Sequence, residues 1–185
     1  MIPQVDANNY TEEVLDSLTL TFARYCKEVT GLNIVDGDGE VIPKLEGSFL
    51  MINVLDTEQR DWEDNEYTLE DGVHFVTHNY TVTFLLTSYR GKPSNALSRI
   101  IQSFSLPYLR DKYFPEGSPY AYSSCSSISR IRVPLNVQTY ENRATVMVTF
   151  NVCVGMVDSG VFEEVENVNI DYNLQSYSNG PFVDT

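Results

Sequence analysis

"NRATVMVTFNVCVGM", residues 142–156, is a proline-free stretch in which strongly apolar side chains alternate with polar or smaller ones. A period of two is typical of a β-strand, because successive side chains point to opposite faces of a sheet. One face would carry Ala144, Val146, Val148, Phe150, Val152 and Val154, and the other Thr145, Met147, Thr149, Asn151 and Cys153. The stretch is therefore predicted to be a long central strand.

A second long strand is predicted over residues 73–89, where the same alternation recurs. Val76, Tyr80, Val82, Phe84 and Leu86 share one face, while Thr77, Asn79, Thr81, Thr83 and Thr87 share the other. Threonine suits a pleated, half-exposed surface. The polar face of the resulting sheet is either solvated, as antiparallel faces commonly are, or covered by a neighbouring molecule. Both interpretations stay open, and composition slightly favours the solvated face.

Two segments have helical periodicity. Residues 10–30 place Val14, Leu15, Leu18, Phe22, Tyr25, Cys26 and Val29 on one face, with Asn9 as a cap before them and Gly31 as the terminating residue. A shorter helix is predicted after Ser94 as its N-cap, with Leu97, Ile100, Ile101 and Phe104 on its apolar face. Residues 108–120 are expected to be a connector.

Three further strands complete the predicted fold, at residues 47–56, 120–135 and 162–172, and Pro134 indicates an edge or strand end. We expect an α+β fold, with a mainly antiparallel sheet of about five strands, two α-helices packed on one face, and an extended acidic loop between the first two strands. Residues 1–185 should form a single domain, with a core of about 10–172, an acidic insert at 56–72 and a C-terminal arm at 173–185.

The chain is strongly acidic, with a formal net charge of −14 over 185 residues. Its few Lys and Arg form no cluster along the sequence, which argues against binding nucleic acid by neutralising phosphates. Residues 56–71 hold eight of the 26 acidic residues and one arginine. This block is either a solvated flap or a functional anionic surface. No stretch is apolar enough to span a membrane, and the N-terminus has no leader-like pattern, so we expect no membrane association.

Candidate metal sites fail on spacing. The "DGDGE" run at 36–40 invites a calcium-loop interpretation, but an EF-hand loop starting at Asp36 would need glycine at its sixth position and glutamate at its twelfth. Val41 and Gly47 stand there instead, so the run is predicted to be a turn. His74 and His78, four residues apart on one strand, lie about 13 Å from each other and are too distant to share a metal ion. We expect no metal and no cofactor.

No arrangement for nucleophilic catalysis is present either. Cys26, Cys125 and Cys153 are odd in number and lack C-x-x-C spacing, and no G-x-S-x-G elbow or phosphate-binding loop occurs. We therefore expect no enzyme activity and no catalytic residues. A carboxylate-dependent enzyme using residues 61–66 remains an alternative, but only Trp62 and Tyr67 are at hand there to build a cleft.

Most of the chain, about 10–172, resembles the neck or tail terminator proteins of tailed bacteriophages. The similarity rests on "TGLNIVDGDGEVIPKLEGSFLMINV" (30–54), "HNYTVTFLLTSYRGKPSNALSRIIQSF" (78–104), "QTYENRATVMVTFNVCV" (138–154) and "EEVENVNID" (163–171). The resemblance implies a structural virion protein of the tail or neck, assembled in the host cytoplasm. Such a protein forms a ring, usually a homohexamer, which caps the tail tube and joins the tail to the neck.

The implied partners are further copies of the chain, the tail tube protein, the neck or connector protein and the sheath, while DNA passes through the ring without specific binding. An anionic lumen would repel passing phosphates, which makes Asp61, Glu63, Asp64 and Glu66 candidate lumen residues. Candidate subunit or partner contacts are Asp36, Asp38, Glu40, Glu141 and Arg143. One alternative is another phage head–tail connector or adaptor protein, and an alternative from a different class is a soluble ligand-binding α+β module.

Overall fold

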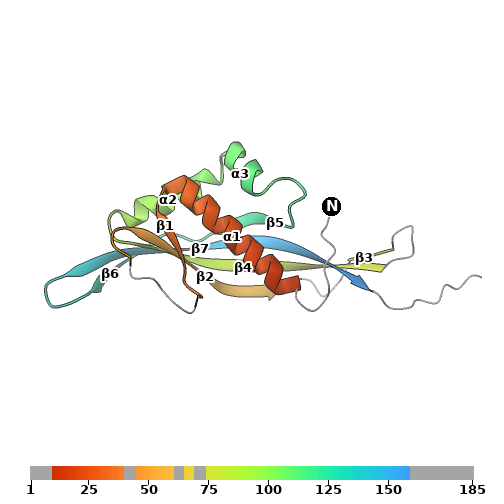
Figure 1. Ribbon diagram of the computed structural model, residues 1–185, viewed down its shortest axis with the longest axis horizontal. Coiled ribbons are helices and arrows are strands. Elements are labelled where there is room, and N and C mark those ends of the chain that lie inside the picture. Colours follow the sequence, from red (N-terminus) through yellow and green to blue (C-terminus); the bar gives the residue numbers. More distant parts are fainter. Residues whose placement is uncertain (1–9, 40–44, 61–64, 69–73, 159–185) are drawn as a thin grey trace, which may run out of the picture.

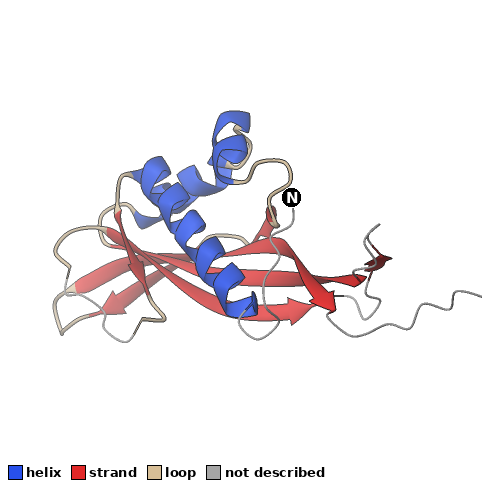
Figure 2. Cartoon of the chain, turned by 45° about the vertical axis from the view of Figure 1, so that its right-hand side comes forward, coloured by secondary structure: helices blue, strands red, loops and turns tan. Residues whose placement is uncertain are grey.

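A computed structural model describes residues 10–39, 45–60, 65–68 and 74–158. In this part of the chain, a seven-stranded sheet carries three helices on one face (Figures 1 and 2). The elements are α1 (Tyr10–Thr30), β1 (Asn33–Asp36), β2 (Phe49–Gln59), β3 (Asn65–Thr68), β4 (His74–Tyr89), α2 (Pro93–Ser103), α3 (Pro107–Tyr113), β5 (Tyr120–Cys125), β6 (Ser129–Pro134) and β7 (Tyr140–Asp158). The predicted α+β class with a mainly antiparallel sheet is confirmed, with more strands and one more helix than expected.

Strand β7 is the centre of the sheet, as its alternation predicts. It pairs antiparallel with β4 from His74↔Asp158 to Tyr89↔Arg143, and on its other side with β5 and then β6. The strand order is β1-β2-β4-β7-β5, with β3 added beside β4 and β6 beside β7. Of the described strand pairs, β1 with β2 is parallel. A proline-free strand can use both of its edges for hydrogen bonds, which is what this central position requires.

The acidic segment differs from the prediction of a loop over 56–72. Strand β2 continues through a bulge between Val54 and Asp56 as far as Gln59, and Asn65–Thr68 form β3 against β4. Acidic side chains are tolerated in this part of β2 because residues 55–60 are exposed to solvent, while the backbone of β2 stays paired with β4 as far as Gln59. A run of charged residues does not by itself indicate a loop, because charged side chains are also common on edge strands.

Other boundaries are shifted as well. The expected strand 120–135 is two strands, β5 and β6, and the expected connector 108–120 contains α3. Ser94 is not the cap of α2, because Lys92 occupies the N-cap and Pro93 is the first helical residue. The predicted cap Asn9, the strand at 162–172 and the arm at 173–185 lie outside the described residues.

Helix α1 begins at Tyr10 and ends where predicted. Gly31 has φ +72°, and its amide donates a hydrogen bond to the Lys27 carbonyl at 2.8 Å. A positive φ at this position is easily adopted by glycine and strained for other residues, which accounts for the helix end.

The core lies between the helices and one face of the sheet and is rich in aromatic rings. Phe150 of β7 stands at its centre, with ring centroids 5.1 Å from Phe22, 5.8 Å from Phe84 and 5.3 Å from Phe114. Tyr25 of α1 stacks on Phe104 at 4.8 Å. Such edge-to-face and offset contacts add to the stabilisation from burial alone.

The three thiols occupy different environments, and their reactivity should differ accordingly. Cys26 is fully buried, and burial raises the pKa of its thiol, whereas Cys125 and Cys153 are partly exposed. Because the thiolate is the reactive form, we expect a maleimide or disulfide reagent to label Cys125 and Cys153 in the folded protein and Cys26 only after denaturation. Mass spectrometry of the labelled peptides measures this. Equal labelling rates at all three thiols would contradict the buried position of Cys26.

Candidate functional site

The first part of the candidate site is an ion cluster formed by Glu141, Arg90 and Arg143, at the end of the sheet where β4 ends and β7 begins. Arg90 Nε donates to Glu141 Oε1 at 3.0 Å, and Arg143 Nε donates to Glu141 Oε2 at 2.7 Å. The Glu141 side chain is 6% exposed, while those of Arg90 and Arg143 are 44% and 31% exposed. One buried carboxylate thus receives charge-assisted hydrogen bonds from two arginines.

The electrostatics of this cluster follow from two opposing effects. Burial alone would raise the pKa of the Glu141 carboxyl, but the hydrogen bonds and positive charges of Arg143 and Arg90 outweigh burial and hold that pKa below its ordinary value of 4.5. Glu141 is therefore ionised at neutral pH.

The ion cluster also connects separate strands. Arg90 has a positive φ of 62°, its amide donates to the Asn142 carbonyl at 2.9 Å, and its guanidinium donates to the carbonyls of Leu45 at 2.9 Å and Gly47 at 3.3 Å. The segment just before β2, the end of β4 and the start of β7 are thereby fixed together. A non-glycine residue in this backbone region is unusual and persists only where its surroundings hold it.

Aromatic rings reinforce this end of the sheet. Phe49 and Tyr89 are cross-strand neighbours whose rings stack with centroids 4.5 Å apart. The Arg143 guanidinium lies 4.8 Å from the centre of the Tyr89 ring, and that of Arg90 lies 5.9 Å from Phe49. Cation–π contacts of this kind orient the two arginines that bind Glu141.

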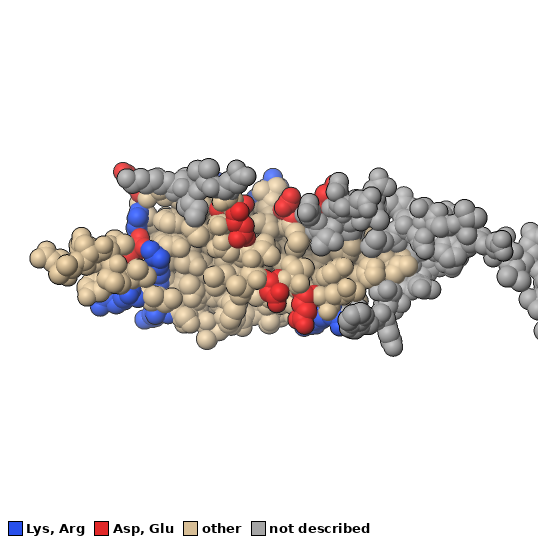
Figure 3. All heavy atoms as spheres, turned by 90° about the horizontal axis from the view of Figure 1, so that it is seen from below, with Lys and Arg blue, Asp and Glu red and all other residues tan. Residues whose placement is uncertain are grey.

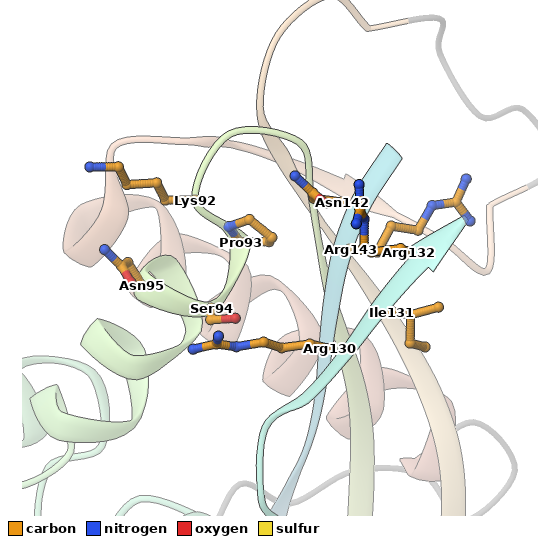
Figure 4. A pocket seen from close by; sticks show the side chains of 9 residues that line it. All are labelled: Lys92, Pro93, Ser94, Asn95, Arg130, Ile131, Arg132, Asn142 and Arg143. Atoms are coloured by element: carbon orange, nitrogen blue, oxygen red, sulfur yellow. The ribbon is translucent and has the colours of Figure 1, made fainter. Parts of the chain in front are cut away.

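The second part of the site is a hollow of about 490 Å³ between the start of α2 and strand β6, which we call the basic hollow (Figure 4). It is lined by Lys92, Pro93, Ser94, Asn95, Arg130, Ile131, Arg132, Asn142 and Arg143. Arg130 extends from β6 toward Ser94 (Figure 4). No acidic side chain of the described residues pairs with Lys92, Arg130 or Arg132. The hollow is therefore a concentration of positive charge on an acidic protein.

The third part is the hairpin of β6 and β7, whose tip lies at one end of the long axis of the molecule (Figure 1). Large apolar side chains on it are exposed, at 45% for Ile131, 60% for Leu135, 97% for Val137 and 57% for Tyr140. The turn itself is ordered, because Asn136 Oδ1 accepts backbone hydrogen bonds from the amides of residues 138 and 139 at 2.9 and 2.8 Å. The hairpin thus presents apolar surface to solvent from a defined turn.

The predicted turn at 36–40 is formed as far as it is described. The Asp38 amide donates to Asp36 Oδ1 at 3.0 Å, and the Asp38 carboxylate accepts from Asn53 Nδ2 at 2.9 Å and from the Val54 amide at 2.6 Å. A Cβ at Gly37 would lie 2.3 Å from Asn53 Nδ2, so the close approach of this turn to β2 favours glycine. These hydrogen bonds and this packing give the acidic and glycine residues a structural role in the turn.

The predicted contact residues fall into two separate groups. Glu141 and Arg143 meet in the ion cluster, whereas Asp36 and Asp38 lie at the edge formed by β1 and β2. Glu40, Asp61, Glu63 and Asp64 lie outside the described residues. Glu66 is in β3, opposite Val76, and its side chain is not described.

Sequence reasoning missed Arg90, Lys92, Arg130 and Arg132. The sequence shows no basic cluster because these residues come from two segments about 40 positions apart, yet β6 and the start of α2 meet beside β7. The signal available was the alternation of "SRIRV", which places Arg130 and Arg132 on one strand face.

Over the described ranges, no group of three or more His, Cys, Asp or Glu side chains is arranged to hold a metal ion. None of the helices in those ranges has the length and apolarity needed to cross a membrane.

The sequence profile of a family described as "Phage neck terminator protein" matches residues 16–178 of the chain. This match covers α1 from Asp16 onward, the whole described sheet and the ion cluster, the basic hollow and the β6–β7 hairpin. No curated protein matches the chain.

Proposed function

The chain belongs to the phage neck terminator family, and from that premise we propose that it is a ring subunit, most simply of a homohexamer, that caps the tail tube and joins the tail to the neck. The partners we propose are further copies of the chain, the tail tube protein, the neck or connector protein and the sheath. The role we propose is structural, without enzymatic chemistry.

The exposed apolar surface of the β6–β7 hairpin is the observation that supports this proposal most directly. Val137 at the hairpin tip is 97% exposed, although a loop that only contacts water gains nothing from an apolar side chain at that position. Exposed apolar patches on otherwise polar proteins mark surfaces for protein partners. The hairpin starts from the ion cluster, where Glu141 and two arginines hold the first residues of β7 in place. A rigid base and an apolar tip suit an element that inserts into a neighbouring protein.

The acidic segment supports a second element of the proposal, a lumen that conducts DNA without binding it. Asp61, Glu63, Asp64 and Glu66 are the residues we propose for this lumen, on the basis of their charge in the sequence. In the same ring, Asp36 and Asp38 at the turn after β1 are proposed subunit or partner contacts, and so is Glu40 on the basis of its charge in the sequence. A cryo-EM map of the neck that places Glu63 on the outer wall would remove the lumen role.

Assembly should be lost when the hairpin tip becomes charged. The variant Leu135→Asp with Val137→Asp is expected to fold like the wild type, because both side chains are exposed. It should nevertheless fail to complement a phage whose own gene is disrupted, lowering the titre by at least about a hundredfold, since a charge buried in an interface without a partner costs several kcal/mol. Plaque titres and electron microscopy of the tails measure this.

The matched control is Leu106→Asp with Tyr108→Asp. These side chains are also exposed, at 51% and 73%, and they lie at the start of α3, where acidic residues are favourable. The control should complement normally. Full complementation by the hairpin variant would show that the apolar tip is not an assembly contact.

A further inference from the structure

Charge is separated between two opposite edges of the sheet. Figure 3 looks onto the face that the helices leave open and shows most of the visible Lys and Arg toward one end, with an acidic side chain among them, and most of the visible Asp and Glu farther along the sheet. The strand order places β2 on one side of β4 and β7, and β6 on the other. One edge is thus acidic and the opposite edge is basic, within the residues that the structure describes.

The acidic edge is the outer half of β2. Strand β1 pairs with β2 only as far as Asp36↔Ile52, and past that point β2 has no further described strand on its outer side. Asp56 and Glu58 lie there, both exposed and without an ion pair among the described residues. Arg60 follows two positions after Glu58, but its single positive charge offsets only one of the two carboxylates, so the local charge remains negative.

The basic edge is β6, which pairs only with β7 in the described sheet. Arg130 and Arg132 lie on it, beside Lys92 at the start of α2, and all three line the basic hollow. The N-terminus of α2 is the positive end of the helix dipole and adds to the positive potential of the hollow. No acidic residue in the first turn of α2 offsets this contribution. Each edge therefore carries two like charges two positions apart, about 7 Å along an extended strand.

We propose that the basic hollow of one copy of this chain binds the Asp56 and Glu58 carboxylates on the β2 edge of a second copy. The contact is heterologous, because the two surfaces are different patches of the same molecule, and repetition of a heterologous contact closes a ring when the rotation between copies allows it. This inference rests on the proposed function and names the residues that make the ring contact.

A second copy fits the hollow better than DNA does. The chain carries a net charge of −14, so a nucleic acid that approached the hollow would meet strong repulsion from the rest of the surface. An acidic edge of the same chain is present at the same concentration as the hollow in any assembly of identical subunits. Complementary charges also fix the orientation of neighbouring copies.

Charge exchange between the edges tests the proposal. One variant reverses the basic edge (Arg130→Glu, Arg132→Glu), a second reverses the acidic edge (Asp56→Lys, Glu58→Lys), and a third combines all four changes. Each purified variant is offered to tail tubes from a phage that lacks the gene, and the rings on tube ends are counted by electron microscopy. Thermal unfolding checks that every variant is folded.

We expect each single-edge variant to lose at least about tenfold in the fraction of capped tubes, and the combined variant, as well as a 1:1 mixture of the two single-edge variants, to recover it. The control Arg99→Glu with Arg110→Glu changes the net charge as the basic-edge variant does, on exposed side chains away from the hollow, and should cap tubes normally. The combined variant has the same net charge as the wild type, so normal capping by the Arg99→Glu, Arg110→Glu control is what shows that the loss in the basic-edge variant does not come from net charge.

Three results would overturn the inference. Normal capping by both single-edge variants, with the hairpin variant still defective, would reject this contact and leave the proposed function standing. Folded single-edge variants that fail without recovery in the combined variant would reject the pairing of these edges. A basic-edge variant that caps tubes normally but loses binding to a short DNA duplex would assign the hollow to nucleic acid. Failure of the wild-type chain to cap tubes would reject the proposed function itself.

Discussion

Replacing Phe150 with alanine is expected to lower the free energy of unfolding by about 3–5 kcal/mol, the range typical of aromatic residues removed from a packed core. The Phe150 side chain is completely buried, and its ring lies within 6.2 Å, centroid to centroid, of Phe22, Phe84, Phe114 and Tyr122. These rings come from α1, from the loop after α3 and from two strands. The vacated space cannot be filled without moving several elements at once, which places the cost toward the upper end of the range.

Denaturant unfolding followed by circular dichroism measures this loss. Tyr108→Ala is the control, because Tyr108 is an aromatic residue that is 73% exposed, and its removal should change the free energy of unfolding by less than about 0.5 kcal/mol. A Phe150→Ala variant as stable as the control would contradict the position of Phe150 at the centre of the core.

Replacing Glu141 with glutamine is expected to cost about 2–3 kcal/mol at neutral pH, since the change removes a buried charge that accepts hydrogen bonds from two arginines. The cost stays below that of a fully buried ion pair because Arg90 and Arg143 are partly exposed and can be rehydrated. Glu116→Gln, at an exposed carboxyl on a turn, is the control and should be close to neutral.

The stabilisation by Glu141 should depend on pH in one direction. The folded pKa of Glu141 lies below its ordinary value of 4.5, so the folded state binds the proton more weakly than the unfolded state does. The contribution is therefore complete above about pH 4.5 and is lost as the pH falls through the lower, folded pKa. The difference in stability between wild type and Glu141→Gln should be constant near neutral pH and shrink in acid. A difference that grows as the pH falls would contradict the ion cluster.

The strands that could be predicted were those with a clear period. Strands β4 and β7 alternate over many residues and are buried on one face only, so pattern alone indicates both their type and their orientation. The α1 helix was predictable for the same reason, with Gly31 as its stop signal. Short strands such as β1 and β3, four residues each, show too little alternation to be predicted from sequence. They form because the longer strands β2 and β4 offer an edge with which they can pair.

The candidate site was only partly predictable, because its residues are brought together by pairing over long sequence distances. Glu141 and Arg143 stand near each other in sequence, and their importance at the start of β7 could be anticipated. Arg90 joins them only because β4 and β7 pair in a register that ends at Tyr89↔Arg143. Lys92 and Arg130 likewise meet through the placement of α2 against β6. No local pattern contains that information.

Tail length in a phage that lacks the gene for this chain tests the central claim most directly, and electron microscopy of the lysate measures it. We expect tail tubes of variable and excessive length that are not joined to heads, with normal tails restored when the wild-type chain is supplied from a plasmid. Tails of normal length, joined to filled heads in the absence of the chain, would contradict this claim.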